Sequence, residues 1–173
     1  MEQVRLYLSR HGETLENQRH VLQGQLPGTL SERGLEQARG LAERMEGVEL
    51  DAVVASDLER SRRTAEIVAE RKGLAVDVTP LLREMDWGEY TGQALVDVDW
   101  FHLPPSVEQV EALYRRAGDF LAYVKEKYAG RRVLAVGHGA FDRAVLCRYE
   151  GRPPFDMVEM PIMGNTEVVE LVY

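Results

Sequence analysis

The sequence is poor in cysteine and contains no long apolar run. Cys147 is the single cysteine among 173 residues, so an internal disulfide is excluded. This fits a reducing cytoplasm, with Cys147 as a packed structural thiol. No segment reaches the roughly 18 apolar residues that a membrane span needs. The first residues also lack the apolar stretch of a signal peptide, so we expect a cytoplasmic protein.

Positive charge is also in deficit, with 21 Lys and Arg against 29 Asp and Glu and a net charge of −8. Nucleic acids and anionic membranes are bound nonspecifically by broad basic surfaces, so neither is an expected partner. If this acidic chain handles an anion, its cationic groups must be concentrated in one pocket.

Apolar patterning predicts alternating strands and helices. Strands are predicted at residues 4–9, 52–56, 74–79, 132–137 and 166–172. Helices are predicted at residues 31–46, 57–72, 106–129 and 140–150, the third of them opening on a Ser106–Gln109 capping box. This alternation predicts an α/β fold: a three-layer α/β/α sandwich with a mostly parallel central sheet, in a single domain over residues 1–173. Residues 85–105 are predicted to be loop and short helix.

Two predicted strands each deliver a histidine at their carboxyl end. Residues 4–9 lead into Arg10-His11-Gly12, and residues 132–137 lead into His138-Gly139. Ligands of open α/β sheets bind at that edge. If the two strands are neighbours, His11 and His138 face each other across a crevice.

Arginines approach the same edge. The strand at 52–56 runs into Ser56-Asp57-Leu58-Glu59-Arg60, which places Arg60 in the first turn of a helix, where anions are favoured. Taken singly, a histidine is more often a core or surface residue, and Arg60 resembles the solvated arginines that follow it. Together with Arg10, the two histidines and Arg60 form a set suited to a dianionic phosphoryl group.

The segment Leu8-Ser9-Arg10-His11-Gly12-Glu13-Thr14, with Asn17, resembles the signature of the histidine phosphatase superfamily, which has the phosphoglycerate-mutase-like fold. Further blocks follow in family order along nearly the whole chain: Gln23-Gly24, residues 30–38, Ser56 to Arg60 with Thr64-Ala65, residues 82–88, and His138-Gly139. The sequence departs from the common pattern at Gln25-Leu26-Pro27 and at Asp142, which leaves the substrate's shape open.

The resemblance implies a role for each residue of the set. His11 would attack phosphorus, while Arg10, Arg60 and His138 would bind the phosphoryl oxygens. Glu84 would donate a proton to the leaving oxygen, with Glu89 as the rival carboxylate. Further substrate contacts are expected from Asn17, Gln23, Gly24 and the backbone N–H of Ala140.

By this resemblance the chain is a phosphomonoesterase that hydrolyses a small phosphorylated metabolite through a phosphohistidine, without cofactor or metal. Its short lid insertion around residues 85–105 favours hydrolysis over transfer. It looks similar to α-ribazole-5′-phosphate phosphatases and to broad-specificity phosphatases. Alternatives are a phosphoglycerate mutase, a protein phosphohistidine phosphatase and a non-catalytic phosphate-binding module. A homodimer is one option for the assembly. The segment Trp100-Phe101-His102 is expected either to cap a pocket or to fill the core.

Overall fold

The computed structural model describes residues 2–94 and 97–173, whose strands form one five-stranded sheet in the order β3-β2-β4-β1-β5. The strands are β1 (Arg5–Arg10), β2 (Ala52–Ala55), β3 (Val76–Val78), β4 (Arg132–Gly137) and β5 (Val168–Val172). The edge strand β5 runs antiparallel to β1, and the other neighbouring pairs are parallel. The prediction of a mostly parallel sheet is therefore confirmed.

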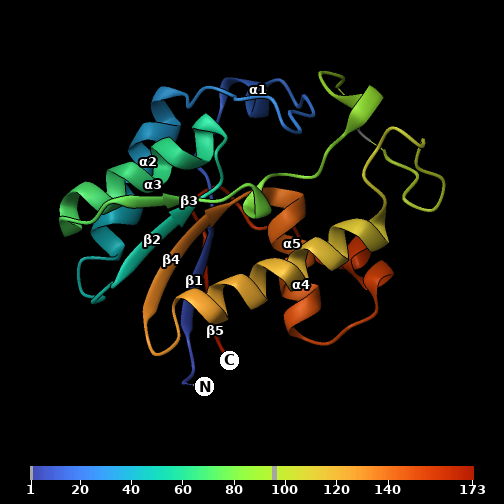
Figure 1. Ribbon diagram of the computed structural model, residues 1–173. Helices are drawn as coiled ribbons and strands as arrows, with labels where there is room; N and C mark the ends of the chain where they lie inside the picture. Colours follow the sequence, from blue (N-terminus) through green and yellow to red (C-terminus); the bar gives the residue numbers. More distant parts are fainter. Residues whose placement is uncertain (1, 95–96) are drawn as a thin grey trace.

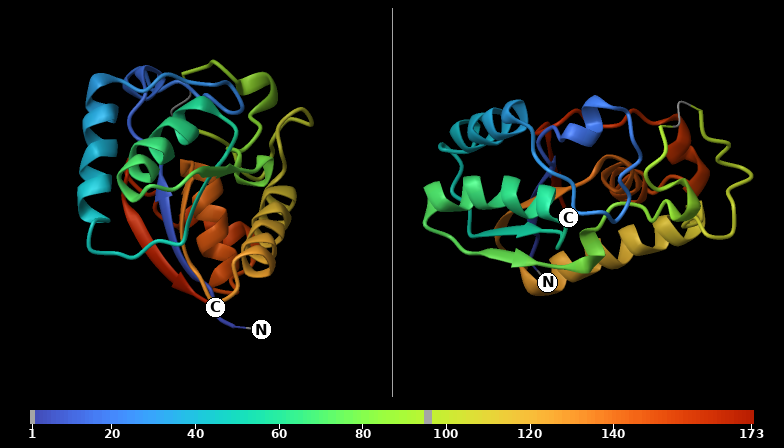
Figure 2. Two further views of the ribbon diagram at one scale, coloured as in Figure 1. Left: turned by 60° about the vertical axis from the view of Figure 1, so that its left-hand side comes forward. Right: turned by 90° about the horizontal axis from the view of Figure 1, so that it is seen from above.

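Helices cover both faces of this sheet (Figure 1). The described residues form the helices α1 (Leu15–Gln18), α2 (Glu32–Arg44), α3 (Glu59–Lys72), α4 (Val110–Lys127) and α5 (Gly139–Tyr149), with short 3-10 helices η1 (Pro80–Leu82), η2 (Gly88–Tyr90) and η3 (Pro154–Glu159). Helices α2 and α3 lie on one face and α4 and α5 on the other, as the turned views of Figure 2 also show. The three-layer α/β/α sandwich is confirmed. No helix within the described ranges is long and apolar enough to cross a membrane.

Strand alternation explains the layers. Val53 and Ala55 of β2 pack in the apolar cluster beneath α2 and α3, whereas Val54 between them packs in the cluster beneath α4 and α5. The side chains of β4 alternate in the same way, because successive residues of a strand point to opposite faces. All four residues of β2 are buried, as expected for a strand that is covered on both sides.

The start of α4 differs from the prediction. The helix begins at Val110, and its N-cap Gln109 makes no side-chain capping bond. Ser106 instead accepts a hydrogen bond from the Glu89 backbone N–H at 3.1 Å and donates to the Glu89 carboxylate at 2.9 Å. The predicted capping box is wrong because a tertiary contact takes the serine hydroxyl. Residues 85–105 contain the short helix η2, as predicted, although residues 95–96 of that segment lie outside the described residues.

Strand register brings the two motif histidines together. Arg10 at the end of β1 pairs with Gly137 at the end of β4, so the residues that follow, His11 and His138, leave the sheet side by side. The His11 backbone N–H continues this pairing by donating to the Gly137 carbonyl at 3.1 Å. Both chain termini lie at the opposite end of the sheet (Figure 1).

Helix α2 packs closely against the loop that follows β1, with the backbone of Gly34 next to that of Glu13. A Cβ atom at Gly34 would overlap the carbonyl oxygen of Glu13, whereas a Cβ at Gly40 of the same helix would meet nothing within 4 Å. We expect Gly34→Ala to lower the free energy of unfolding by about 1–3 kcal/mol through overpacking. Gly40→Ala should raise it by about 0.5–1 kcal/mol, because alanine is the better helix former.

Urea unfolding of the wild type and both variants, fitted with one common m-value, measures both changes in the free energy of unfolding. Stabilisation by both substitutions would contradict the close approach of α2 to this loop.

Candidate active site

His11 lies at the wall of a cavity of about 170 Å³ and is only 2% exposed. Its ring Nδ1 is 2.6 Å from the Gly12 carbonyl oxygen, which can only accept, so Nδ1 carries the proton and Nε2 keeps a free lone pair. Burial, followed by the charges of Arg60 and Arg10, holds the pKa of His11 well below its ordinary value. The imidazole is therefore neutral at physiological pH.

Arg60 is fully buried in the first turn of α3, as the sequence predicted. Its guanidinium donates to the carbonyl of Gly24 at 2.7 Å, to that of Pro27 at 3.2 Å and to that of Leu26. Burial lowers its pKa to about 10, so the side chain stays charged at neutral pH. The loop from residue 24 to 27 thus holds this cation against the cavity.

Arg10 supplies the second guanidinium of the cavity from the end of β1. It donates to the Met163 carbonyl at 3.0 Å, and its buried Nε has no hydrogen-bond partner among the described residues. Burial lowers its pKa, which nearby carboxylates, Glu84 first among them, partly offset. Arg10 and Arg60 therefore both bring positive charge to the His11 side of the cavity.

His138 stands directly behind His11, with ring centroids 5.2 Å apart and the planes tilted by 58°. It is completely buried and does not line the cavity, and its Nε2 is 2.7 Å from the Ser56 hydroxyl. Burial and the charge of Arg60 keep its pKa well below the ordinary value. The two rings lie side by side, as expected, but they do not face each other across the cavity, because His138 does not line it. Direct contact of His138 with a phosphoryl oxygen stays a prediction.

Glu84 faces the same cavity from the loop after η1. Its carboxylate accepts hydrogen bonds from the backbone N–H groups of Met85 at 2.7 Å, Phe141 at 3.0 Å and Ala140 at 3.2 Å. Ala140 lines the cavity as expected, but its N–H points to Glu84. In this structure that N–H is bonded to the Glu84 carboxylate at the N-terminus of α5, and the expected phosphate contact by the Ala140 N–H stays a prediction.

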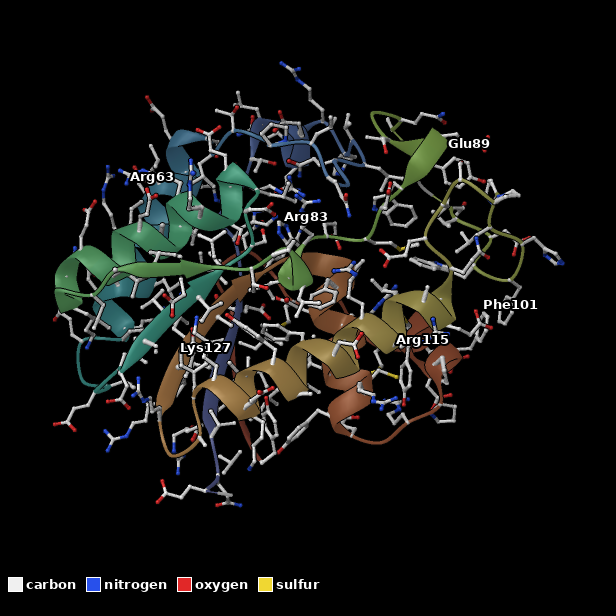
Figure 3. The ribbon with its side chains drawn as sticks, viewed as in Figure 1. Arg63, Arg83, Glu89, Phe101, Arg115 and Lys127 are labelled. Atoms are coloured by element: carbon white, nitrogen blue, oxygen red, sulfur yellow. The ribbon has the colours of Figure 1, made fainter. Side chains whose placement is uncertain are left out.

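The rival carboxylate, Glu89, lies in η2 at the periphery of the molecule, as Figure 3 shows. It accepts a hydrogen bond from Ser106 and does not line the cavity. Geometry therefore favours Glu84 over Glu89 as the carboxylate next to His11.

The other expected contacts also reach the cavity. Asn17 accepts the Thr14 N–H on Oδ1 at 3.0 Å, which leaves its Nδ2 amide as the group available to a ligand. Gln23 is buried, and its Oε1 has no hydrogen-bond partner within the described part of the chain. Gly24 adopts a positive φ of 52°, and its carbonyl is used to hold Arg60.

Several supporting residues were not assigned a role from the sequence. Thr64 accepts the Gly12 N–H at 3.1 Å, and Asn165 donates to the His11 carbonyl at 3.0 Å. Thr64 belongs to a block that resembles the family, so its position carried a signal. No local pattern links Asn165 to the histidine loop, because that contact joins opposite ends of the chain.

The segment Trp100-Phe101-His102 lies beside the cavity that His11 lines, but none of its three residues lines that cavity. Trp100 packs edge-on against the cavity residue Trp87, with centroids 5.4 Å apart, and the Arg143 guanidinium lies 5.0 Å from its ring centre. Phe101 is 69% exposed at the edge of the molecule (Figure 3), and His102 is exposed beside Asp99. Of the two options left by the sequence, Trp100 therefore fills the edge of the apolar core, where it is partly buried against Trp87. His20 is also exposed, as expected of a surface residue.

The neighbours of Arg60 behave as solvated helix residues. Arg62 and Arg63 are exposed and pair with Glu66 at 3.5 Å each, and Figure 3 places Arg63 on the outer side of α3. The described ranges contain no group of three or more His, Cys, Asp or Glu arranged to hold a metal ion.

Two guanidinium groups, a neutral imidazole with one free nitrogen and a carboxylate beside them are suited to phosphoryl transfer to histidine. The comparisons agree with that class. A family model of the histidine phosphatase superfamily (branch 1) matches residues 6–173, and the chain belongs to this family.

Two of the similar proteins are named for different activities. The chain is 32% identical over 164 residues to the adenosylcobalamin/alpha-ribazole phosphatase of Escherichia coli strain K12, covering 87% of this chain and 81% of that protein. It is 45% identical over 150 residues to a "Probable phosphoglycerate mutase" of Erwinia tasmaniensis, covering 79% and 70%.

Solved structures share the architecture. A mycobacterial glucosyl-3-phosphoglycerate phosphatase in complex with VO3 superposes with a TM-score of 0.87 at 29% identity, over 96% of this chain and 91% of that one. The fold assignment is thereby confirmed.

Replacing Arg60 by methionine should raise the pKa of His11. Of the two charges that oppose protonation of His11, Arg60 has the larger effect, so its removal moves that pKa upward toward the ordinary value near 6.5. The histidine ring signals, followed by NMR between pH 5 and 8, would then titrate at higher pH than in the wild type.

Arg62→Met, two residues further along α3 and exposed, is the matched control and should leave the His11 titration in place. An unchanged titration in Arg60→Met, in a protein shown by circular dichroism to be folded, would contradict the assigned electrostatics.

Proposed function

We propose that this protein is a phosphomonoesterase that hydrolyses a small phosphorylated metabolite through a phosphohistidine formed on His11. The observation that carries the proposal is the fixed tautomer of His11. The Gly12 carbonyl holds the proton on Nδ1, so Nε2 can serve as nucleophile in a cavity that also contains Arg10 and Arg60.

In the first step, Nε2 of His11 attacks phosphorus in line with the ester oxygen, the N–P bond forms and the P–O bond breaks. Arg10 and Arg60 stabilise the charge on the remaining phosphoryl oxygens as it redistributes. Glu84, on the same cavity wall, gives its proton to the leaving oxygen, so the alcohol departs neutral.

In the second step, water attacks the phosphohistidine and Glu84 takes up the proton that the water loses. The N–P bond breaks, inorganic phosphate leaves and His11 returns to its neutral form. The low proton affinity of His11 supports this cycle, since the nucleophile is ready again without losing a proton to solvent.

The proposal requires no metal ion. Metal ions in phosphatases neutralise phosphoryl charge and activate the nucleophile. Here two guanidinium groups supply positive charge, and the lone pair of His11 supplies the nucleophile.

Two relatives support different substrates. Similarity to the Escherichia coli enzyme supports α-ribazole-5′-phosphate as substrate, and a broad range of esters is the alternative. Similarity to the Erwinia protein supports a phosphoglycerate mutase as second candidate. A mutase would convert 3-phosphoglycerate to 2-phosphoglycerate without releasing phosphate, whereas the phosphatase releases phosphate in proportion to ester consumed. A protein phosphohistidine phosphatase stays an alternative, while the presence of every expected catalytic group argues against a non-catalytic module.

His11→Ala should reduce hydrolysis of p-nitrophenyl phosphate by at least about a thousandfold, because no other group can replace the nucleophile. His20→Ala removes an exposed histidine and is the matched control, expected at wild-type rate. Brief incubation with a 32P-labelled ester, followed by alkaline quench, should label the wild type and the control but leave His11→Ala unlabelled. Near-normal turnover by His11→Ala would refute the nucleophile.

Activity should survive dialysis against EDTA and be inhibited by vanadate. Vanadate adopts the five-coordinate geometry of the transferring phosphoryl group, and it is expected to compete with the ester at the arginines. The measurement is the rate of p-nitrophenyl phosphate hydrolysis before and after chelation, and with increasing vanadate. Loss of activity on chelation, restored by a divalent metal, would show that metal independence is wrong.

A further inference from the structure

We propose that the substrates of this site are phosphate monoesters whose alcohol part is apolar and carries no second negative charge. This inference rests on the proposed function and specifies its substrate class. It follows from what lines the cavity outside the phosphate-binding groups.

The rest of the cavity wall is largely apolar. Four of the lining residues outside the phosphate-binding groups are large hydrophobic side chains: Val21, Leu22, Trp87 and Ile162. Trp87 is buried, whereas Ile162 is 49% exposed at the mouth. An alcohol part that is apolar would remove this surface from water, which favours its binding.

This wall is held in place before any ligand arrives. The Leu22 backbone donates to the Gln93 carbonyl at 2.9 Å and accepts from the Gly92 N–H at 2.7 Å. Trp87 is supported from behind by Trp100. A wall fixed in this way selects for shape and polarity and does not adapt to a charged group.

The positive charge of the cavity is used by the phosphate itself. Arg10 and Arg60 are the cationic side chains that line it within the described residues, and a phosphoryl dianion matches their two charges. Both are also tied to backbone carbonyls, which limits their movement toward another group. A carboxylate on the alcohol part would find no further cation among the residues that line the cavity.

Arg143 is a further cation close to the cavity that could bind a carboxylate of the substrate. It is 95% buried beneath Trp100, and its Nε and Nη2 have no hydrogen-bond partner among the described residues. Arg143 does not line the cavity, and its guanidinium lies against the indole of Trp100. If Trp100 moved, Arg143 could bind a carboxylate of the substrate. The test therefore includes a variant in which Arg143 is replaced.

The test compares three alkyl esters whose leaving alcohols have similar intrinsic reactivity: benzyl phosphate, glycerol 3-phosphate and 3-phosphoglycerate. Wild-type kcat/KM should fall in that order, with at least a tenfold difference between the first and the last. Equal or better use of 3-phosphoglycerate would overturn the substrate class. Use of 3-phosphoglycerate that is lost in Arg143→Met would overturn it as well and identify Arg143 as the carboxylate site.

A variant with a positive charge at the mouth of the cavity tests the role of the apolar wall directly. Ile162→Lys should lower the ratio of kcat/KM for benzyl phosphate over that for 3-phosphoglycerate by at least fivefold, because it supplies the missing cation and removes apolar surface. Val78→Lys makes the same change at an equally exposed valine of β3 that does not line this cavity, and it should leave the ratio unchanged. An unchanged ratio in Ile162→Lys would overturn the role of this wall.

The two proposals fail in different ways. If the wild type hydrolyses none of the three esters nor p-nitrophenyl phosphate, the phosphatase assignment is wrong. If all three are hydrolysed through His11 with no preference, the phosphatase assignment holds and the substrate class is wrong.

Discussion

The site depends on keeping His11 neutral between two guanidinium groups. A protonated imidazole there would add a third positive charge to a buried cluster, and each unit by which its pKa is depressed corresponds to about 1.4 kcal/mol of that repulsion and desolvation. The same charges that discourage a proton on His11 attract a phosphoryl dianion. One electrostatic arrangement therefore prepares the nucleophile and binds the group it attacks.

Backbone carbonyl oxygens bind the two guanidinium groups that lie close together in this site. Arg60 donates to the carbonyls of residues 24, 26 and 27, and Arg10 donates to that of Met163. These oxygens are neutral dipoles, so they hold the guanidinium groups without cancelling their charge as a carboxylate would. The positive potential thus stays available to a ligand, although the whole chain is acidic.

Much of the site could be predicted because its parts are local in sequence. His11 and His138 each follow a buried strand, and parallel pairing of those strands necessarily brings the residues after them together. Arg60 is placed by the strand-to-helix turn before α3. The predicted capping box failed because a local group has a competing tertiary partner: Ser106 bonds Glu89 instead of capping α4.

The amino-acid sequence by itself determined the reactive groups, the order of strands and helices, and hence the class of chemistry. Only the tertiary structure decided which nitrogen of His11 is free, that His138 stands behind it, and that Leu22 and Ile162 share one apolar wall. The physical reason is that a local pattern reports hydrophobic period and turn chemistry over a few residues. Hydrogen-bond partners and cavity walls are formed by segments far apart in the chain, whose approach depends on packing of the whole core.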